Sequence, residues 1–476
     1  MRSFFNNIKT LYSNDNCCVK VGNELTDTFL ANQGVKQGCI LSPLLFNIFI
    51  SDIIDCFATE ECRPLKIGES HISCLLWADD VILLSRSEEG LRNMLSALSS
   101  YVEENGMAIN VKKTKCMIFN KTGKFIRRSY PIKNGTIETT KSYKYLGLLF
   151  TPSGEICSGL KDLKERAMRA YQKLKHKLGH QFRLHPLTTI SLFDSLVKPI
   201  LLYSSDFWGC LKMPKNNPIE NFYMRFCKEL LGVQTQTSNL GSLLELGAVP
   251  IMFFGIKNCL KNWDRIHRQN EANSILLDVH RMATDHGLPW QILTKQTLES
   301  IGIEPASDID NIHKAAFEKL KENFHRDSFA EINSERSKLR TYAHMKKETG
   351  LESYIIHMKN IMDRTAVTKI RLSNHELMIE KGRHQGLELK DRLCPFCENV
   401  LENEQHFLLD CKTFKIHREN FITEIRKLNN NFDELTENEK FQYTLTDLDA
   451  LRFTGAYLSK TLQVRKFLLE KHKQNG

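Results

Sequence analysis

The sequence predicts an α+β protein in which strands and helices mix over the first 150 residues and helices dominate the remainder. Two observations lead to this class. Short apolar runs bounded by Gly, Asn and Asp occupy much of residues 17–150, as in small sheets. From about residue 157 the apolar residues recur at helical spacing instead. The 476 residues are 41% hydrophobic and 26% charged, which fits several folded domains and excludes a disordered or fibrous chain.

Charge and hydropathy limit the partners that the chain can have. Lys and Arg outnumber Asp and Glu by 66 to 56, a mild bias toward polyanions. The longest apolar stretch, residues 40–54, is interrupted by Ser42, Pro43 and Asp52 and is too short and polar to span a membrane. The N-terminus lacks the apolar core of a signal peptide. We therefore expect an intracellular protein, in the nucleus or the cytoplasm, that is not secreted and keeps its 14 cysteines as thiols.

The first expected elements are a hairpin and a helix. Residues 17–21 and 25–30 flank a Gly-Asn pair that tolerates the positive φ of a tight turn. Ser42 is expected to cap a helix over residues 44–57, with Pro43 in the first helical position, where the missing N–H has no cost.

A second hairpin follows, with acidic residues at its tip. The apolar runs 72–77 and 81–84 are separated by Ala-Asp-Asp, and residues 88–104 then show the spacing of a helix that Asn-Gly closes. The remaining expected strands lie at 108–109, 116–119 and 145–150, and the expected helices at 161–185, 192–202, 219–231, 253–267 and 311–324.

The adjacent carboxylates of Asp79 and Asp80 are unusual at a hairpin tip, because like charges repel and Asn-Gly or Asp-Gly is the common turn. A pair of divalent cations would offset this charge, and carboxylate oxygens suit Mg²⁺. Two such ions stabilise the attacking and leaving oxygens in nucleotidyl transfer. The alternative is a solvated polar turn.

Four motifs include and surround this pair. They are GVKQGCILSPLLFN at residues 34–47, WADD at 77–80, GMAINVKKTK at 106–115 and YLGL at 145–148. In order and spacing they resemble the palm motifs of reverse transcriptases, specifically those of non-LTR (LINE-type) retrotransposons. The resemblance implies a partial palm, built as an antiparallel sheet with helices, then a mostly helical thumb and connection and a small zinc knuckle.

The resemblance also implies roles for single residues of the palm. Asp79 and Asp80 would bind the catalytic Mg²⁺. Gln37 and Gly38 would contact the incoming nucleotide and the template, where glycine permits close backbone approach, although a purely structural turn is the alternative for Gly38. Trp77 stands where the family commonly has Tyr or Phe, so its bulkier ring would lie near the nucleotide.

Two further motifs are implied to act on the leaving group and the primer. Lys113 matches a lysine that assists the pyrophosphate leaving group, a cation placed where negative charge develops. Solvated surface is the alternative for it. Tyr145, Leu146 and Gly147 match the grip on the primer terminus, with a core strand turn as the alternative.

One part of the family's palm has no counterpart in this sequence. The family's metal site includes a further Asp on an upstream strand, and its template-holding fingers lie further upstream. The acids before Gly34 are Asp15, Glu24 and Asp27, and none lies in an apolar strand. We therefore expect an RNA-directed DNA polymerase by descent that is catalytically incomplete as this chain. The alternative is a non-catalytic, retrotransposon-derived nucleic-acid-binding protein.

The sequence leaves open whether the chain is a truncated gene model, a decayed copy or a domesticated gene. Without upstream fingers, the apolar side chains of the first helix would be left exposed. They are Phe4, Phe5, Ile8, Leu11 and Tyr12.

The segment after the palm is rich in cations. Between residues 161 and 185 eight basic residues face two acids, which would let a thumb-like helix follow nucleic-acid phosphates or would simply form a solvated face. The basic residues are Lys161, Lys164, Arg166, Arg169, Lys173, Lys175, Lys177 and Arg183.

Cys394, Cys397, His406 and Cys411 have the spacing of a closed tetrahedral Zn²⁺ site, with Cys-x2-Cys as the knuckle. The alternative is three unligated thiols beside a surface histidine. Four basic residues near the cluster indicate RNA or DNA contact, with a structural zinc staple as the alternative. They are Lys381, Arg383, Lys390 and Arg392.

We therefore expect a partial palm over residues 1–155, a helical thumb-like region over 156–270, a helical connection over 271–385, a CCHC zinc knuckle over 386–425 and a C-terminal helical segment over 426–476. The expected partners are RNA and DNA, as template and primer, and no membrane. The expected cofactors are Mg²⁺, if the chain is active, and Zn²⁺. The sequence leaves the oligomeric state open.

Overall fold

The computed structural model describes residues 2–13, 16–31, 33–68, 70–178, 184–268, 275–305, 311–334, 339, 341–397 and 399–474, without the side chains of residues 2–4 and 472–474. Asp15, Arg183 and the side chain of Phe4 therefore lie outside the described residues. The chain divides into two units, one of residues 1–143 with 271–282 and the other of residues 144–270 with 283–476. No helix in the described ranges is both long and apolar enough to cross a membrane.

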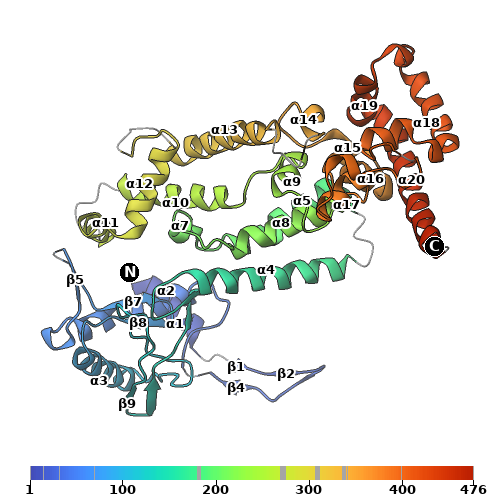
Figure 1. Cartoon of the computed structure of the whole chain (residues 1–476). Coiled ribbons are helices and arrows are strands. Elements are labelled where there is room, and N and C mark those ends of the chain that lie inside the picture. Colours follow the sequence, from blue (N-terminus) through green and yellow to red (C-terminus); the bar gives the residue numbers. More distant parts are fainter. Residues whose placement is uncertain are drawn as a thin grey trace. The chain divides into compact units, whose positions relative to one another are not determined.

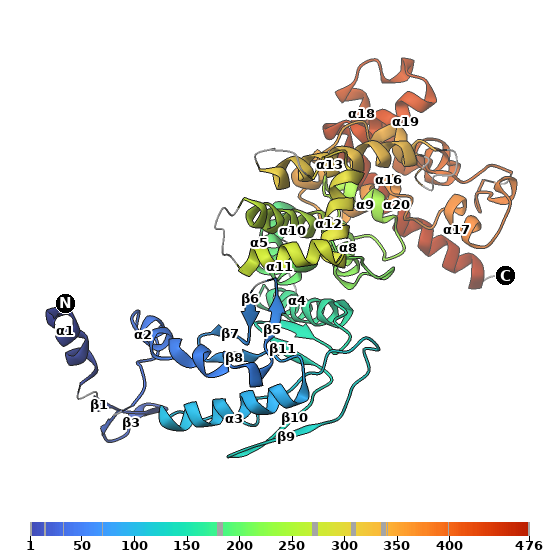
Figure 2. The same ribbon diagram turned by 90° about the vertical axis from the view of Figure 1, so that its left-hand side faces the viewer.

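The first unit combines helices with small two-stranded sheets (Figures 1 and 2). Its helical segments are α1 (Arg2–Tyr12), α2 (Ser42–Phe49), the 3-10 turns η1 (Ser51–Phe57) and η2 (Glu60–Cys62), and α3 (Glu88–Glu104). Its strands are β1 (Asn16–Cys17), β2 (Lys20–Val21), β3 (Glu24–Leu25), β4 (Phe29–Leu30), β5 (Leu65–Ile67), β6 (Ser70–Ile72), β7 (Cys74–Trp77), β8 (Asp80–Leu83), β9 (Ser129–Ile132) and β10 (Gly135–Glu138). They pair antiparallel as β1–β4, β2–β3, β5–β6, β7–β8 and β9–β10. Within the described residues the expected palm sheet is thus a set of separate two-stranded sheets.

The core of this unit lies between α3 and η1. Phe57 and Met94 are fully buried there, and the inward residues of β7 pack against them. The Tyr101 hydroxyl donates a 2.5 Å hydrogen bond to the Asp52 carboxylate, which joins the same two elements. The predicted helix over 88–104 is confirmed, with Ser87 accepting from the N–H of Gly90 as its cap.

Several expectations for this unit were wrong in detail. Ser42 does not cap α2, because its hydroxyl donates instead to the Lys36 carbonyl at 2.6 Å. Residues 108–109 form no strand, and residue 116 makes a single bridge to Thr139, since the chain between them folds into turns around Asn110. The β9–β10 hairpin was missed, although Asn134-Gly135 between two apolar pairs is a good hairpin signal.

The second unit is mostly helical. Its strands are β11 (Tyr143–Tyr145), which begins at the boundary of the two units, and β12 (Leu148–Phe150). Its first helices are α4 (Cys157–Lys177), α5 (Pro186–Leu196), α6 (Lys198–Leu201), α7 (Ser205–Trp208), α8 (Pro218–Leu231), α9 (Asn239–Glu245) and α10 (Met252–His267). After α11 (Ile275–Asp285), which is divided between the units, come α12 (Pro289–Ser300), α13 (Ile312–Ile332), α14 (Tyr342–Met345), α15 (Ser353–His357), α16 (Ile361–Arg371) and α17 (Met378–His384). The C-terminal elements are η3 (Leu389–Asp391), η4 (His406–Asp410), η5 (Lys412–Phe414), α18 (Lys415–Leu428), η6 (Phe432–Glu434), α19 (Glu437–Thr446) and α20 (Leu448–Gln474).

The helices predicted over 219–231, 253–267 and 311–324 are present as α8, α10 and α13, with shifted ends. The helix predicted over 161–185 is present as α4, and residues 179–183 of that range lie outside the described residues. The helix expected over 192–202 is broken after Leu196, because Pro199 cannot donate the backbone hydrogen bond that would continue it. Tyr171 of α4 packs inward against the rings of Phe193, Phe222 and Phe226, as its helical position predicts. One apolar core extends from β12 and α4 to α20 and includes Cys394 and Cys411.

An ion network centred on a fully buried arginine crosses this core. The Arg371 guanidinium donates to Glu245 at 2.7 Å and to the Leu445 carbonyl at 2.7 Å, and it forms a 2.7 Å ion pair with Glu352. The hydroxyls of Tyr342 and Tyr354 also donate to Glu245, at 2.8 and 2.5 Å. Arg371 and Glu245 are both 0% exposed, so their charges are satisfied by the protein rather than by water, whereas the Glu352 side chain is 21% exposed.

Exposed apolar side chains gather on α1, the following hairpins and α2. The prediction for the first helix is confirmed for Phe5 and Leu11, which are 66% and 56% exposed. Ile8 and Tyr12 are half-buried, and the Tyr12 hydroxyl is hydrogen-bonded to Cys39 and Ser42. The others that are more than half exposed here are Val21, Leu25, Phe29, Ile40, Leu44 and Ile48.

We predict that a Leu44→Gln/Ile48→Gln variant binds less of the dye ANS and aggregates less than the wild type. These side chains are 59% and 63% exposed, so the change removes apolar surface without opening a cavity. Dye fluorescence and analytical ultracentrifugation measure the two effects. The matched control is Leu389→Gln/Ile416→Gln, which alters two exposed apolar residues of the second unit and should leave aggregation unchanged. Equal improvement by both variants would contradict the prediction.

Candidate functional sites

The acidic pair lies at the tip of the β7–β8 hairpin. Trp77 pairs with Asp80 across the ladder, so Ala78 and Asp79 form the two-residue turn and Asp80 begins β8. Ala78 has a φ of 51°, a left-handed conformation that costs a non-glycine residue roughly 1 kcal/mol. Both carboxylates are exposed, and neither has an ion-pair partner among the described residues. Adjacent acids without a protein cation are suited to a metal ion.

The rest of the hairpin separates a core face from a solvent face. The side chains of Cys74 and Leu76 pack on the core, whereas Leu75 and Trp77 are 46% and 65% exposed. Trp77 thus presents its ring on the outer face beside the acids. In the described ranges no third Asp, Glu, His or Cys joins Asp79 and Asp80 in a group able to hold a metal ion.

Gln37 and Gly38 form the centre of a turn closed by the Cys39 N–H and the Lys36 carbonyl at 3.2 Å. Gly38 has a φ of 86°, which a side chain would strain, and open space surrounds the position of a Cβ. The conformation of the turn therefore requires glycine at position 38, and the absence of a side chain also leaves the backbone open to a ligand.

Lys113 is exposed and ends a turn that Asn110 caps. No described residue pairs with its ammonium group.

Tyr145, Leu146 and Gly147 form a tight turn between β11 and β12. Leu146 and Gly147 have φ values of 43° and 81°, the two positive angles of a type I′ hairpin turn. The single strand expected over residues 145–150 is therefore interrupted: Tyr145 ends β11, and β12 begins at Leu148. The Tyr203 hydroxyl donates to the Leu146 carbonyl at 2.5 Å, and Arg166 of α4 donates to the Gly147 carbonyl at 2.7 Å.

These two anchors of the turn were missed from sequence. Arg166 was expected only as one of the basic residues that face phosphates or solvent. A Cβ at Gly147 would lie 3.0 Å from the Tyr203 ring, so glycine is required there by contact as well as by φ. No local sequence signal marks such a contact, because the residues are far apart along the chain.

Helix α4 carries cations, most of them exposed to solvent. Of the predicted basic residues, Arg166 and Lys175 are engaged with protein groups, the latter with Glu229. The others have no hydrogen-bond or ion-pair partner among the described residues. They are Lys161, Lys164, Arg169, Lys173 and Lys177, which we call the α4 cations.

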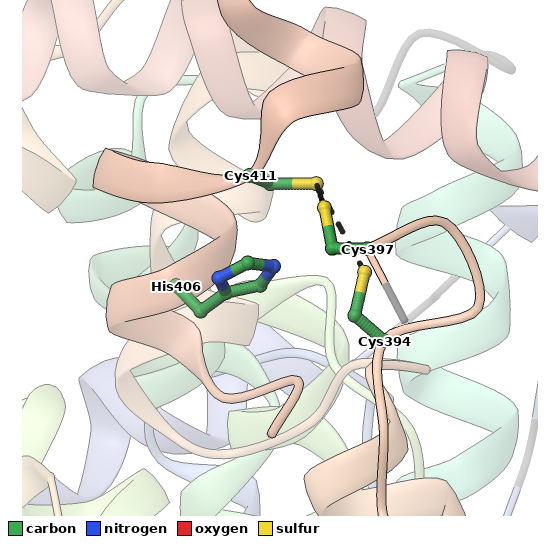
Figure 3. Close-up of side chains that lie close together, drawn as sticks. All are labelled: Cys394, Cys397, His406 and Cys411. Carbon is green, nitrogen blue, oxygen red and sulfur yellow. Dashed lines mark hydrogen bonds between the residues drawn. The ribbon is translucent and has the colours of Figure 1, made fainter. Parts of the chain in front are cut away.

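The three cysteines and the histidine of the predicted knuckle converge (Figure 3). Their ligand atoms all lie within 4.8 Å of one another, and the Cys411 sulfur lies 4.0 Å from that of Cys394 and 3.5 Å from that of Cys397. A tetrahedral Zn²⁺ site places its ligand atoms roughly 3 to 4 Å apart, and these two pairs meet that spacing. Within the described residues this is the one group of three or more candidate metal ligands.

Local structure places each ligand. Cys394 and Cys397 flank a turn held by the bond from the Cys394 N–H to the Val400 carbonyl at 2.7 Å. His406 opens the π-helical turn η4, where the Asn403 side chain accepts its N–H at 2.7 Å. The Cys411 N–H donates back to the His406 carbonyl at 2.7 Å, which brings the last thiol over the first two.

The chemistry of the cluster fits a zinc ion. The hydrogen bond between Cys394 and Cys411 lowers the pKa of Cys411 and raises that of Cys394, so the pair favours a thiolate at Cys411. The Nε2 atom of His406 is buried without a described hydrogen-bond partner. A thiolate and an unpartnered imidazole nitrogen are the ligand types that Zn²⁺ takes.

The basic residues beside the cluster mostly bind protein groups. Arg392 donates to the carbonyls of Leu387 and Ile379, Arg383 pairs with the buried Glu380 at 2.6 Å, and Lys390 pairs with Glu388 at 2.8 Å. Lys381 is half-buried. The guanidinium groups thus act in local structure, which favours the staple alternative over phosphate contact at these positions.

Comparison with known proteins agrees with the site geometry. Residues 2–150 match the family model described as "Reverse transcriptase (RNA-dependent DNA polymerase)". The chain is 26% identical over 212 residues to "Retrovirus-related Pol polyprotein from type-2 retrotransposable element R2DM" of Drosophila melanogaster, a match that covers 42% of this chain and 19% of the relative.

Two other relatives match similarly. A type-1 R2 element polyprotein of Nasonia vitripennis is 28% identical over 232 residues, 45% of this chain and 22% of that protein. The "RNA-directed DNA polymerase from mobile element jockey" of Drosophila melanogaster is 22% identical over 206 residues, 42% of this chain and 22% of that protein. Each match spans about a fifth of the relative's length. Residues 2–150 are therefore a reverse transcriptase domain, and the chain is related by descent to the RNA-directed DNA polymerases of non-LTR retrotransposons.

Proposed function

We propose that this chain binds an RNA or DNA template-primer as part of a retrotransposon RNA-directed DNA polymerase, to whose Mg²⁺ site Asp79 and Asp80 contribute two carboxylates. The observation that carries the proposal is the exposed acidic pair, without a described protein cation, at a hairpin tip inside the matched domain. Bound Mg²⁺ would supply charge stabilisation at the reacting phosphate. The free thiols of all 14 cysteines support an intracellular site of action.

The other palm residues have supporting roles in this proposal. Gln37 and the open backbone at Gly38 would contact template and nucleotide, and the exposed Trp77 ring would cover the nucleotide from the outer face of the hairpin. Lys113 would approach the leaving pyrophosphate. The turn at Tyr145, Leu146 and Gly147 would hold the primer end.

The α4 cations would hold the nucleic-acid backbone. At about 100° per residue, Lys161, Arg169 and Lys173 lie within about 120° of one another around α4, and Lys161 and Lys173 are about 18 Å apart along its axis at 1.5 Å per residue. A strand of B-form DNA has one phosphate per roughly 3.4 Å of axis, so several phosphates fit along this length. This contact needs no catalysis, and it therefore also supports the second candidate, a non-catalytic nucleic-acid-binding protein.

A metal site of two carboxylates is weaker than one of three. Because no third metal ligand joins the pair in the described ranges, we infer that this chain alone binds a divalent ion weakly and does not extend a primer. The zinc site has a different role. We infer that Zn²⁺ at Cys394, Cys397, His406 and Cys411 stabilises the fold of the second unit, since the cluster lies in its main core.

The first prediction here concerns the α4 cations. A Lys161→Ala/Arg169→Ala/Lys173→Ala variant should bind an RNA–DNA hybrid about tenfold or more weaker at 0.1 M salt, because three phosphate contacts are lost. The slope of log affinity against log salt should fall in magnitude by about 2 to 3. Fluorescence anisotropy over a salt series measures both. The control Lys212→Ala/Lys215→Ala/Lys460→Ala removes the same charge at exposed sites away from α4. Equal loss in the control would show a nonspecific charge effect and reject the helix as the binding site.

The second prediction concerns the acidic pair. Mn²⁺ titration followed by electron paramagnetic resonance should show one weakly held ion that Asp79→Asn/Asp80→Asn removes. Asp27→Asn/Glu24→Gln is the control at other exposed acids. Primer extension by the wild-type chain with Mg²⁺ should be undetectable. Extension that depends on Asp79 and Asp80 would show that the chain completes its own metal site.

The third prediction concerns zinc. The purified chain should contain one zinc per molecule, and chelation or Cys394→Ser should increase hydrogen exchange over residues 390–415 while leaving the first unit unchanged. Cys18→Ser, a change at an exposed thiol, is the control and should retain zinc. A chain without zinc, or unaltered exchange in Cys394→Ser, would mean that the four side chains converge without binding a metal.

A further inference from the structure

A pocket lies next to the zinc cluster and is separate from the palm and α4. It encloses about 410 Å³, within the size range of small-ligand sites. Its walls come from α14, α17, α19 and the segment between Cys397 and His406. The buried side chains of Ile379 and Phe441 and the half-buried Leu401 form an apolar lining.

Five polar side chains in this lining have no side-chain partner among the described residues. One is Thr341, whose hydroxyl is buried. Of the other four, His344 and Asn438 are exposed and Gln405 and Gln442 are half-buried. The two other polar residues of the knuckle segment are already engaged. Asn403 accepts the N–H of His406, and Glu404 is hydrogen-bonded to the buried His375 at 3.0 Å. The free groups are therefore three carboxamides, an imidazole and the Thr341 hydroxyl, and we call the pocket that they line the carboxamide pocket.

This chemistry fits an unpaired nucleobase. A carboxamide offers a donor and an acceptor side by side, as the hydrogen-bonding edge of a base does, and an apolar lining suits the flat face of a base. The pocket's one carboxylate, Glu404, is 1% exposed and paired with His375, so no open negative charge repels a polynucleotide. A peptide strand would instead need a free edge of backbone groups, which this lining of side chains does not provide.

We propose that the carboxamide pocket holds one unpaired base of a single-stranded nucleic acid. The knuckle would then contact nucleic acid through a base and not through phosphates, which agrees with the engagement of Arg383 and Arg392 in protein contacts. The proposal goes beyond the proposed function, because it requires neither Asp79 and Asp80 nor the α4 cations.

The test measures base preference by the full zinc-loaded chain. Fluorescence anisotropy with labelled rA10, rC10 and rU10 should show unequal affinities. Asn438→Ala/Gln442→Ala should weaken the best of these decamers about tenfold and bring the three affinities close together, without changing the salt slope. The control Gln385→Ala removes an exposed carboxamide outside the pocket and should preserve the preference. The α4 variant should weaken all three decamers alike, so the failure of one proposal is distinguishable from the failure of the other.

Several results would overturn the inference. Equal affinity of the wild type for the three decamers would do so, as would a uniform loss with a changed salt slope, which indicates phosphate contact. Displacement of the decamer by acetyl-Gly-Asn-Gly-amide but not by AMP, CMP or UMP would identify a peptide site. If zinc content or circular dichroism shows that Asn438→Ala/Gln442→Ala misfolds, His344→Ala/Gln405→Ala tests the pocket from its other wall with the same criteria.

Discussion

The C-terminal unit depends on a charge that water cannot reach. Arg371 is completely buried, so its guanidinium must be neutralised and hydrogen-bonded inside the core, and Glu245 and Glu352 do this from α9 and from the residue before α15. Removing one partner from such a buried pair costs about 3–5 kcal/mol, because the other charge is left unpaired. Since the Leu445 carbonyl at the end of α19 is a third acceptor, one side chain determines where helices from three parts of the chain meet. Apolar packing alone would allow more than one arrangement of these helices.

The cluster of three cysteines and His406 is attached to this core by a second buried ion pair. Glu402, between Cys397 and His406, binds Arg465 of α20 through two bonds of 2.8 and 2.6 Å and also accepts the N–H of Met378 at 2.7 Å. The rings of Phe407 and Phe414, both 0% exposed, pack against each other between the ligands and α18. The four side chains therefore join the ends of the segment from Cys394 to Cys411, whose other contacts already belong to the main core. This is the arrangement expected if the cluster stabilises the fold.

Sequence predicted the features that depend on local chemistry. The turn at the Gly-Asn pair, the helix that Ser87 caps, the acids at the hairpin tip and the convergence of four metal ligands each follow from residues close together along the chain. The sequence could not predict contacts between distant segments. The role of Arg371 is one such case, because a buried arginine cannot be told from an exposed one until its partners Glu245 and Glu352 are placed. Likewise Ser42 has the residue type of a helix cap but uses its hydroxyl on Lys36, since a tertiary turn competes with the local bond.

The bond from Arg166 to the carbonyl of Gly147 links the β11–β12 turn to the same helix that carries the α4 cations. An α-helix is stiff over five turns, so α4 fixes the distance and the rotation angle between the β11–β12 turn and each cation. A polynucleotide lying along α4 would have its position relative to the turn set in steps of the helical repeat. A single residue inserted after Arg166 would rotate every later cation by about 100° and shift it by about 1.5 Å. These cations would then no longer have their original positions relative to the β11–β12 turn. Length, as well as charge, is therefore a constrained property of α4.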